Sequence, residues 1–473
     1  RVNLDTTNAN RWYPVVAADA DGYLYVVWTD YRDDSTRRSD IYCQRLSPAG
    51  IHSWTGDVRV NEDVGWVQQT RPNIAIDDNG NAIVVWMDYR NGAANLYTQK
   101  LNAFGVSLWS SDVRVNQSAI VWWGRIVVDE SGHAVITWID DRTGQDEVYV
   151  QRLSPAGVAV WPDNVIVNVD TTDCERAPGG VVLTQGTNVY VVWRDNRSGV
   201  SQVYAQLLNS EGQRQWSNDI RVNSTIESNL YAPMSASDTE DNLVVVWGRS
   251  GSAGLYGQKI TPMGITIWTE DTYIRGPNTK YGISIPNDPT ITVSDGRIFI
   301  AWTDRRTSLW GSDDILLQAI EGDGTPSWGG LRVPHKRSGA AAQTGPAVSS
   351  TALDNSYVVM WTDNRADDLH NVYAQRYDAS GSRLWPVEIR INGSQTAFLR
   401  TARFAFDLSG NMLVAWCRYP SLQVAMQKID INGNSLWAEE VALPGYTTIP
   451  PLLATSSTGS VFVGWVEWVG SQY

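Results

Sequence analysis

Residues 82–109 read AIVVWMDYRNGAANLYTQKLNAFGVSLW, and this arrangement recurs throughout the chain. It contains an apolar segment that ends at Trp86, a second apolar segment around Gln99, and a glycine, Gly105, four residues before Trp109. Because eight intervals separate the first such tryptophan from the ninth, the repeat has a period of about 55 residues. The nine tryptophans are Trp28, Trp86, Trp138, Trp193, Trp247, Trp302, Trp361, Trp416 and Trp465.

The glutamine and the Gly–Trp hairpin recur with the same order. The glutamines are Gln44, Gln99, Gln151, Gln206, Gln258, Gln318, Gln375 and Gln427. The hairpin pairs are Gly50/Trp54, Gly105/Trp109, Gly157/Trp161, Gly212/Trp216, Gly264/Trp268, Gly324/Trp328, Gly381/Trp385 and Gly433/Trp437. The two repeated tryptophan positions account for 17 of the 23 Trp in the chain.

Each repeat predicts four short strands. An RVN-type segment such as residues 59–61, a loop that usually ends at proline, a further strand and a tight turn such as residues 77–80 complete the unit. Short apolar runs separated by Gly, Asn and Asp turns, without helical periodicity, indicate antiparallel β-sheets. Such a sheet cannot bury both faces alone, so we expect the sheets to stack radially as the blades of a β-propeller.

The repeats predict one all-β domain spanning residues 1–473, a propeller of four-stranded antiparallel blades. The chain begins with an RVN-type outer strand, residues 1–3, and ends after the ninth tryptophan segment. Pairing of the N- and C-terminal strands would close the ring as a ninth blade and remove an open sheet edge. We therefore expect nine blades, and the alternative is an eight-bladed ring with a leftover half repeat.

The composition excludes several classes of function. The 37 basic and 51 acidic residues give a net charge of −14, which disfavours nucleic acid as a partner. No segment approaches the ~18 consecutive apolar residues of a transmembrane helix, so no membrane span is expected. The 3 Cys and 4 His lack the spacing of a disulfide framework or a zinc site, so we expect neither a metal nor a cofactor.

The sequence carries two resemblances to known families. The hairpins YDASGSRLW (residues 377–385) and IDINGNSLW (residues 429–437) resemble the tryptophan-docking repeats of quinoprotein-type propellers, which implies the fold and the docking of blades only. The adjacent cysteine pair of the quinone-dependent enzymes is missing, which disfavours a quinone-dependent oxidoreductase. The VVWxDxR segments resemble repeats of uncharacterised bacterial secreted and surface proteins, which implies a secreted or cell-surface location, with the periplasm as an alternative.

Six of the nine repeats carry an aspartate and an arginine two and four residues after the strand tryptophan, as in Trp86/Asp88/Arg90. A ring of carboxylates could be catalytic or bind calcium. Because the pair recurs and catalysis needs one asymmetric site, we expect instead that each aspartate orients its arginine and locks neighbouring blades. The same argument makes the repeated glutamine structural, and it favours an ordinary turn over a calcium loop at residues 19–22.

Function is therefore expected where the repeat varies. The WxDxR loops and the RVN-to-Pro loops share one predicted face, which is rich in arginine and aromatic residues that suit a glycan or a protein partner. Packing of these aromatics as plugs over the blades is the alternative. The candidate ligand-binding residues are Arg11, Trp12, Trp66, Arg71, Trp122, Trp123, Arg125, Arg176, Tyr231, Tyr281, Trp310, Arg400 and Arg403.

The sequence favours a monomeric, non-enzymatic scaffold that binds a glycan or a protein through this face. One alternative is a glycoside hydrolase or lyase with its site at the mouth of the central channel. Its candidate carboxylates are Asp173 with Glu175, and Glu227, although no local motif specifies a catalytic pair. A purely structural propeller is the remaining alternative.

Overall fold

A computed structural model describes residues 2–464 apart from 6–8, 22, 48–50, 118–120, 173, 225–229, 250–253, 269, 275–289, 295–296, 305–313, 329–342, 352–353, 355, 367–368, 394–397, 408, 420–422, 443–451 and 456–460. The chain divides into two compact units. The first comprises residues 1–199, 203–221 and 454–473, and the second comprises residues 200–202 and 222–453. Each unit is built from consecutive repeats.

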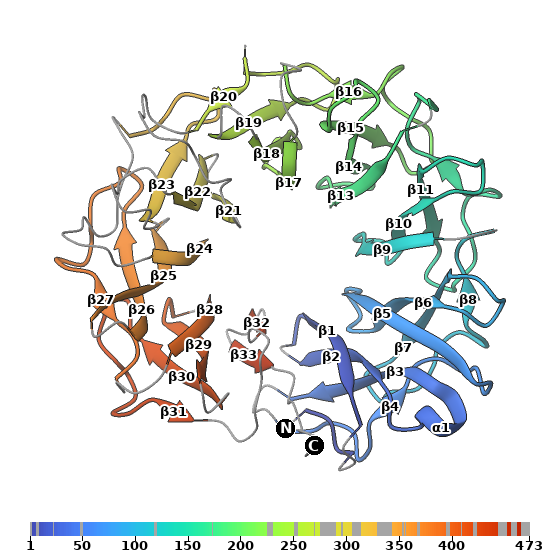
Figure 1. Ribbon diagram of the computed structural model, residues 1–473, viewed down its shortest axis with the longest axis horizontal. Coiled ribbons are helices and arrows are strands. Elements are labelled where there is room, and N and C mark those ends of the chain that lie inside the picture. Colours follow the sequence, from blue (N-terminus) through green and yellow to red (C-terminus); the bar gives the residue numbers. More distant parts are fainter. Residues whose placement is uncertain are drawn as a thin grey trace. The chain divides into compact units, whose positions relative to one another are not determined.

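The strands of the first four repeats follow one another in chain order (Figure 1). A single helical turn, α1 (Asp34–Arg37), interrupts them. They are β1 (Arg11–Ala18), β2 (Leu24–Asp30), β3 (Arg38–Leu46), β4 (Val58–Arg59), β5 (Val67–Ile76), β6 (Ala82–Asp88), β7 (Asn95–Leu101), β8 (Val113–Arg114), β9 (Val121–Val128), β10 (Ala134–Asp140), β11 (Glu147–Leu153), β12 (Val165–Ile166), β13 (Arg176–Leu183), β14 (Val189–Asp195), β15 (Gln202–Leu208) and β16 (Ile220–Arg221).

The later repeats form the same kind of sheet. Their strands are β17 (Leu230–Ser237), β18 (Leu243–Arg249), β19 (Gly254–Ile260), β20 (Thr272–Tyr273), β21 (Thr290–Ser294), β22 (Arg297–Asp304), β23 (Asp314–Ile320), β24 (Gln343–Ser350), β25 (Tyr357–Ala366), β26 (Leu369–Tyr377), β27 (Ile389–Arg390), β28 (Phe398–Phe406), β29 (Met412–Tyr419), β30 (Gln423–Ile429), β31 (Val441–Ala442), β32 (Leu452–Thr455) and β33 (Val461–Gly464).

The predicted four-stranded antiparallel sheets are confirmed in seven repeats, and three strands of an eighth are described. A short parallel bridge between β3 and β5 joins the first two sheets. The last two strands, β32 and β33, form a two-stranded sheet. Among the described residues no sheet joins the N- and C-terminal strands, so ring closure and the number of blades stay predictions.

The apolar core lies between neighbouring sheets. Ile83 and Val85 of β6 belong to the same buried cluster as Ile136 and Trp138 of β10. The apolar residues of the strands thus alternate toward the sheets on either side, as expected of a sheet that is buried on both faces. The first strands of successive sheets, β1, β5 and β9, also lie next to one another (Figure 1).

The hairpin glycine and tryptophan dock one sheet on the next. The indole N–H of Trp109 donates to the carbonyl oxygen of Pro155, in the following hairpin, at 3.0 Å. A Cβ atom on Gly157 would lie 2.6 Å from the ring of Trp109, and Gly157 has a φ of +77°. Only glycine fits this close approach and this left-handed backbone, which explains why each hairpin carries it.

Candidate functional site

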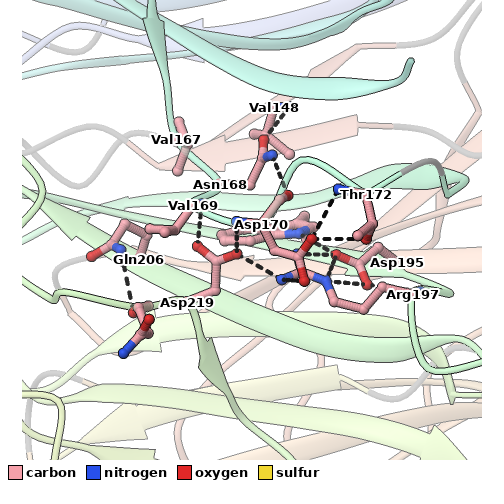
Figure 2. Close-up of polar contacts among 12 residues, drawn as sticks. Val148, Val167, Asn168, Val169, Asp170, Thr172, Asp195, Arg197, Gln206 and Asp219 are labelled. Atoms are coloured by element: carbon pink, nitrogen blue, oxygen red, sulfur yellow. Dashed lines mark hydrogen bonds and ion pairs between the residues drawn. The ribbon is translucent and has the colours of Figure 1, made fainter.

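The Asp–Arg pair that follows the strand tryptophan lies in an ion-pair network, shown around Arg197 in Figure 2. Asp195 accepts the indole N–H of Trp193 at 3.1 Å and binds the guanidinium Nε of Arg197 at 2.8 Å. Arg197 also binds Asp219 at 2.8 Å. The other oxygen of Asp219 accepts the backbone N–H of Val169, which follows β12 of the preceding sheet, at 2.7 Å. The network therefore joins two sheets.

The same contacts recur in the other repeats. Arg90 binds Asp88 and Asp112, and Asp112 accepts the backbone N–H of Glu62. Burial alone would lower the pKa of Arg90, but hydrogen bonds to the two carboxylates outweigh burial and raise it, so the arginine keeps its charge. The guanidinium lies 4.1 Å from the ring centroid of Tyr97, so three groups fix it. These carboxylates hold sheets together, and none of them is available as the centre of a catalytic site.

The turn aspartates are also engaged. Asp19 accepts the backbone N–H of Tyr23 at 2.7 Å with one oxygen and binds Arg45 at 2.8 Å with the other. Both carboxylate oxygens of Asp19, the first residue of the loop at residues 19–22, are thus used within the protein. Across the described part of the chain, no group of three or more metal-ligating side chains comes together.

A cavity of about 440 Å³ lies on the three adjacent first strands β1, β5 and β9. We call it the first-strand trough. Its lining consists of Tyr13, Pro14, Val15, Arg71, Pro72, Asn73, Gly124 and Arg125.

A β-bulge in each strand shapes the trough. In β1 the register shifts between Trp12 and Val15, so that two residues, Tyr13 and Pro14, stand opposite a single residue of β2. The corresponding shift in β5 lies between Thr70 and Asn73. Bulges re-aim side chains and are frequent beside functional sites. Here they turn side chains of neighbouring sheets toward one cavity.

Two large side chains occupy strained backbone in the trough. Tyr13 and Arg71 both have a φ of 53°, in the left-handed region. At the matching bulge of β24 this position is a glycine, Gly345, with a φ of 62°. A left-handed conformation costs a non-glycine residue roughly 1–2 kcal/mol. Tyr13 and Arg71 therefore carry backbone strain that the glycine at the β24 bulge does not.

The trough is aromatic and positively charged. The Arg71 guanidinium lies 5.4 Å from the ring centroid of Tyr13. Asn73 is held between strands, because its amide donates to Gly124 O at 3.5 Å and its Oδ1 accepts the Ile74 N–H at 2.9 Å. Among the described lining residues there is no carboxylate.

Two of the predicted site residues lie in buried ion pairs instead. Arg11 binds Asp30 at 3.0 Å, and its side chain is 8% exposed. The Arg176 side chain is fully buried, 3.4 Å from Glu147 and 3.8 Å from Asp195. These arginines belong to the sheet-joining networks.

The predicted aromatics Trp12 and Trp66 are exposed, at 46% and 62%. Trp66 is oriented by a hydrogen bond from its indole N–H to Asp34 O at 3.0 Å, and Arg38 lies over its ring. The alternative that these aromatics plug the sheets does not hold for these two tryptophans. Neither residue lines the trough.

The remaining predicted residues divide into three groups. Arg71 and Arg125 come together in the trough, and Arg403 is exposed in β28 of the second unit. For Trp122, Trp123, Tyr231 and Arg400 the structure gives the strand positions only, in β9, β17 and β28. Tyr281 and Trp310 lie outside the described residues.

Among the predicted carboxylates, Glu175 is exposed just before β13, whereas Asp173 and Glu227 lie outside the described residues. The sequence prediction missed Asp146, in the loop before β11. Burial raises the pKa of Asp146, and the negative charges of Asp141 and Glu175 raise it further, against an opposing hydrogen bond from Arg176. Asp146 and Glu175, in loops of neighbouring repeats, thus lie near enough for their charges to interact.

Sequence reasoning also missed the roles of Tyr13 and Asn73. The dipeptides Tyr13–Pro14 and Arg71–Pro72 were the available signal, because proline inside a strand pattern marks a bulge. The partner strand that turns each bulge into a cavity wall is set by tertiary packing.

No known protein family and no curated protein matches the sequence. Similar solved structures include dipeptidyl peptidase 4 of Porphyromonas gingivalis, with 12% identity over 97% of this chain and 65% of that chain and a TM-score of 0.50. The α-L-arabinofuranosidase Arb93A of Fusarium graminearum matches with 10% identity over 65% and 92% of the two chains, at a TM-score of 0.35. The Hadza microbial sialidase Hz136 matches with 13% identity over 62% and 63%, at a TM-score of 0.34.

These matches have very low identity and bear on the fold alone, and the match to dipeptidyl peptidase 4 agrees with a β-rich, propeller-like fold for this chain. They contradict the sequence prediction of a non-enzymatic binding scaffold, because the proteins concerned are enzymes. At these identities they show a shared fold and assign no activity to this chain. Within the described residues no helix has the length and apolar content to span a membrane.

Proposed function

We propose that this protein is a secreted or surface-exposed glycoside hydrolase whose substrate binds in the first-strand trough. The observation that carries the proposal is the cavity itself, with Tyr13 and Arg71 held in left-handed backbone beside Arg125. A concave site with an aromatic face and a few fixed polar groups suits a sugar, which offers C–H faces and hydroxyls together.

The acid and base of the proposed reaction are Asp146 and Glu175. Asp146, whose pKa is raised chiefly by burial, would donate a proton to the leaving glycosidic oxygen as the bond to the anomeric carbon breaks. Glu175 would take a proton from the attacking water, so that hydrolysis consumes one water and returns the enzyme unchanged. Both residues lie in the same unit as the trough, and β13 packs against β9.

A lyase is the second candidate, because the described lining of the trough offers Tyr13 and two arginines but no carboxylate. Elimination next to a sugar carboxylate needs a base for a carbon-bound proton and cations that neutralise the carboxylate. The tyrosine and the arginines match those roles, and the product would carry a new carbon–carbon double bond.

The activity test is a reducing-end assay on a panel of plant, bacterial and animal glycans with the wild-type protein, Asp146→Asn, Glu175→Gln and Tyr13→Phe. Glu130→Gln, an exposed residue of the turn between β9 and β10, is the matched control. Hydrolysis predicts loss of turnover by about 100-fold or more in the two carboxyl variants with melting temperatures unchanged. New reducing ends with ultraviolet absorbance of an unsaturated sugar, lost in Tyr13→Phe, would favour the lyase. Absence of cleavage across the panel would contradict both.

We also propose that the repeats form one nine-bladed ring in a single domain. The N-terminal segment supports this, because the backbone N–H of Leu4 donates to Asp57 at 2.8 Å. Glu62 and Val169, which follow the outer strands β4 and β12, donate in the same way to Asp112 and Asp219. By this contact, the residues just before Leu4 would serve as an outer strand that precedes the first sheet. The segment that holds β33 belongs to the same compact unit as residues 1–199, which agrees with a last blade shared by both ends.

A further inference from the structure

The trough concentrates positive charge in an acidic protein. The chain has a net charge of −14, yet the charged residues that line this cavity are Arg71 and Arg125, as far as the structure describes it. Local cationic charge in a protein of opposite net charge attracts an anionic ligand specifically to that place.

Arg125 differs from the arginines that join the sheets. Arg90, Arg142 and Arg197 each bind the aspartate of their own WxDxR segment, and their side chains are 10–18% exposed. Arg125 is exposed on β9, and no ion pair joins it to a carboxylate of the described residues. Its guanidinium is thus available to a ligand carboxylate, which it can bind through two parallel hydrogen bonds.

The neighbouring groups fix the geometry of such a contact. The ring of Tyr13 orients the guanidinium of Arg71, and the adjacency of β5 and β9 brings Arg71 and Arg125 to one cavity. Asn73, in the same lining, donates its amide N–H to the carbonyl oxygen of Gly124. A planar anion can therefore meet two guanidinium groups while the sugar ring that carries it contacts the tyrosine.

We propose that the first-strand trough recognises a carboxylate-bearing sugar, either a uronate or a nonulosonate. This inference names the substrate class of the proposed hydrolase and rests on that function for its biological meaning. Arg71 and Arg125 bind the sugar carboxylate, and Tyr13 packs against the sugar ring.

The test measures binding by calorimetry on Glu175→Gln, so that turnover does not disturb it. Two matched probe pairs separate the two sources of the carboxylate: trigalacturonate with its methyl ester, and 3′-sialyllactose with lactose. The acidic member of one pair is expected to bind at least about tenfold more tightly than its neutral partner, and raised salt should narrow the difference.

Variants test whether the trough causes the tighter binding of the acidic probe. Added to the Glu175→Gln protein, Arg125→Gln and Arg71→Gln should each remove about tenfold of the preference for the acid, whereas Arg383→Gln, an exposed hairpin arginine, should leave it unchanged. Unaltered melting temperatures would show that the variants fold. Equal binding within both pairs, absence of binding to both acids, or a preference that survives in Arg125→Gln would each overturn the inference. Cleavage of neutral glycans without tighter binding of the acidic sugars would overturn this inference but would leave the proposed hydrolase function standing.

Discussion

At the scale of single residues, the buried indole N–H of each strand tryptophan requires an acceptor. The aspartate two residues later supplies it in five described repeats, as Asp195 does for Trp193. The repeats at Trp247 and Trp416 carry an arginine at this position, and there the indole N–H has no partner among the described residues. An unpaired buried donor costs free energy, so these two repeats are expected to be the weaker ones.

Replacing Trp247 by Phe removes a donor that has no partner among the described residues, whereas replacing Trp193 by Phe leaves Asp195 without one of its donors. Both tryptophans are fully buried, so the loss of volume is similar. We expect Trp193→Phe to lower the free energy of unfolding by about 1–2 kcal/mol more than Trp247→Phe. Chemical denaturation of the two variants measures the difference, and equal losses would contradict the role given to Asp195.

Asp354 gives a prediction for acid stability. Burial would raise its pKa, but hydrogen bonds from Ser356 and Thr351 and the charge of Arg376 outweigh burial and lower the pKa to about 2. A carboxyl whose folded pKa lies below its unfolded value stabilises the protein above the unfolded value, near pH 4, and loses this effect as the pH falls toward 2.

Asp354→Asn should therefore lower the melting temperature at pH 6 and 7. The gap in melting temperature between the variant and the wild type should shrink steadily below pH 4. Melting curves across this range provide the measurement. A gap that stays constant down to pH 2 would show that the charge of Asp354 contributes nothing.

At the scale of elements, the sequence predicts the strands, their order and the hairpins well, because apolar runs and Gly or Asn turns are local signals. The bulges in β1, β5 and β9 are harder to predict, since register depends on the partner strand. The same limit explains why the sequence did not predict the buried ion pairs of Arg11 and Arg176. Their buried partners come from other segments of the chain, which no local pattern reveals.

The docking of hairpins can be tested in one repeat with two glycines of similar backbone. Gly157 has a φ of +77° and faces the ring of Trp109, whereas Gly144 has a φ of +84° and a Cβ atom added to it would meet no described atom within 4 Å. Gly144→Ala should cost about 1 kcal/mol through backbone strain alone. Gly157→Ala should cost roughly 1–3 kcal/mol more, because it also displaces the indole.

The free energy of unfolding of each variant checks this prediction. If both substitutions cost the same, the glycine is required for its turn and the tryptophan contact contributes nothing. A larger cost at Gly157 assigns the difference to docking between neighbouring sheets.

At the scale of the whole molecule, the sequence predicts an all-β, repeat-built chain, and the structure agrees. The sequence also places Arg71 and Arg125 among the functional candidates, because they depart from the repeat on a variable face. The trough itself could not be predicted, since it requires three sheets side by side. Nor could the proximity of Asp146 to Glu175, which lie in loops of two repeats.

Closure of the ring predicts that Leu4 and Val461, both in the first unit, lie within one blade of each other. Four strands about 4.8 Å apart span roughly 15–20 Å. Spin labels at these positions, with Cys43, Cys174 and Cys417 replaced by alanine, should give a narrow distance distribution below about 30 Å once label length is included. A broad distribution at longer distances would favour an open array.

The central claim is that the first-strand trough is the substrate site. Arginine-specific labelling with phenylglyoxal, mapped by mass spectrometry with and without a bound acidic oligosaccharide, tests it most directly. The account predicts that the oligosaccharide protects Arg71 and Arg125 from labelling and leaves Arg383 reactive. Protection of arginines elsewhere with Arg71 and Arg125 still labelled would contradict it.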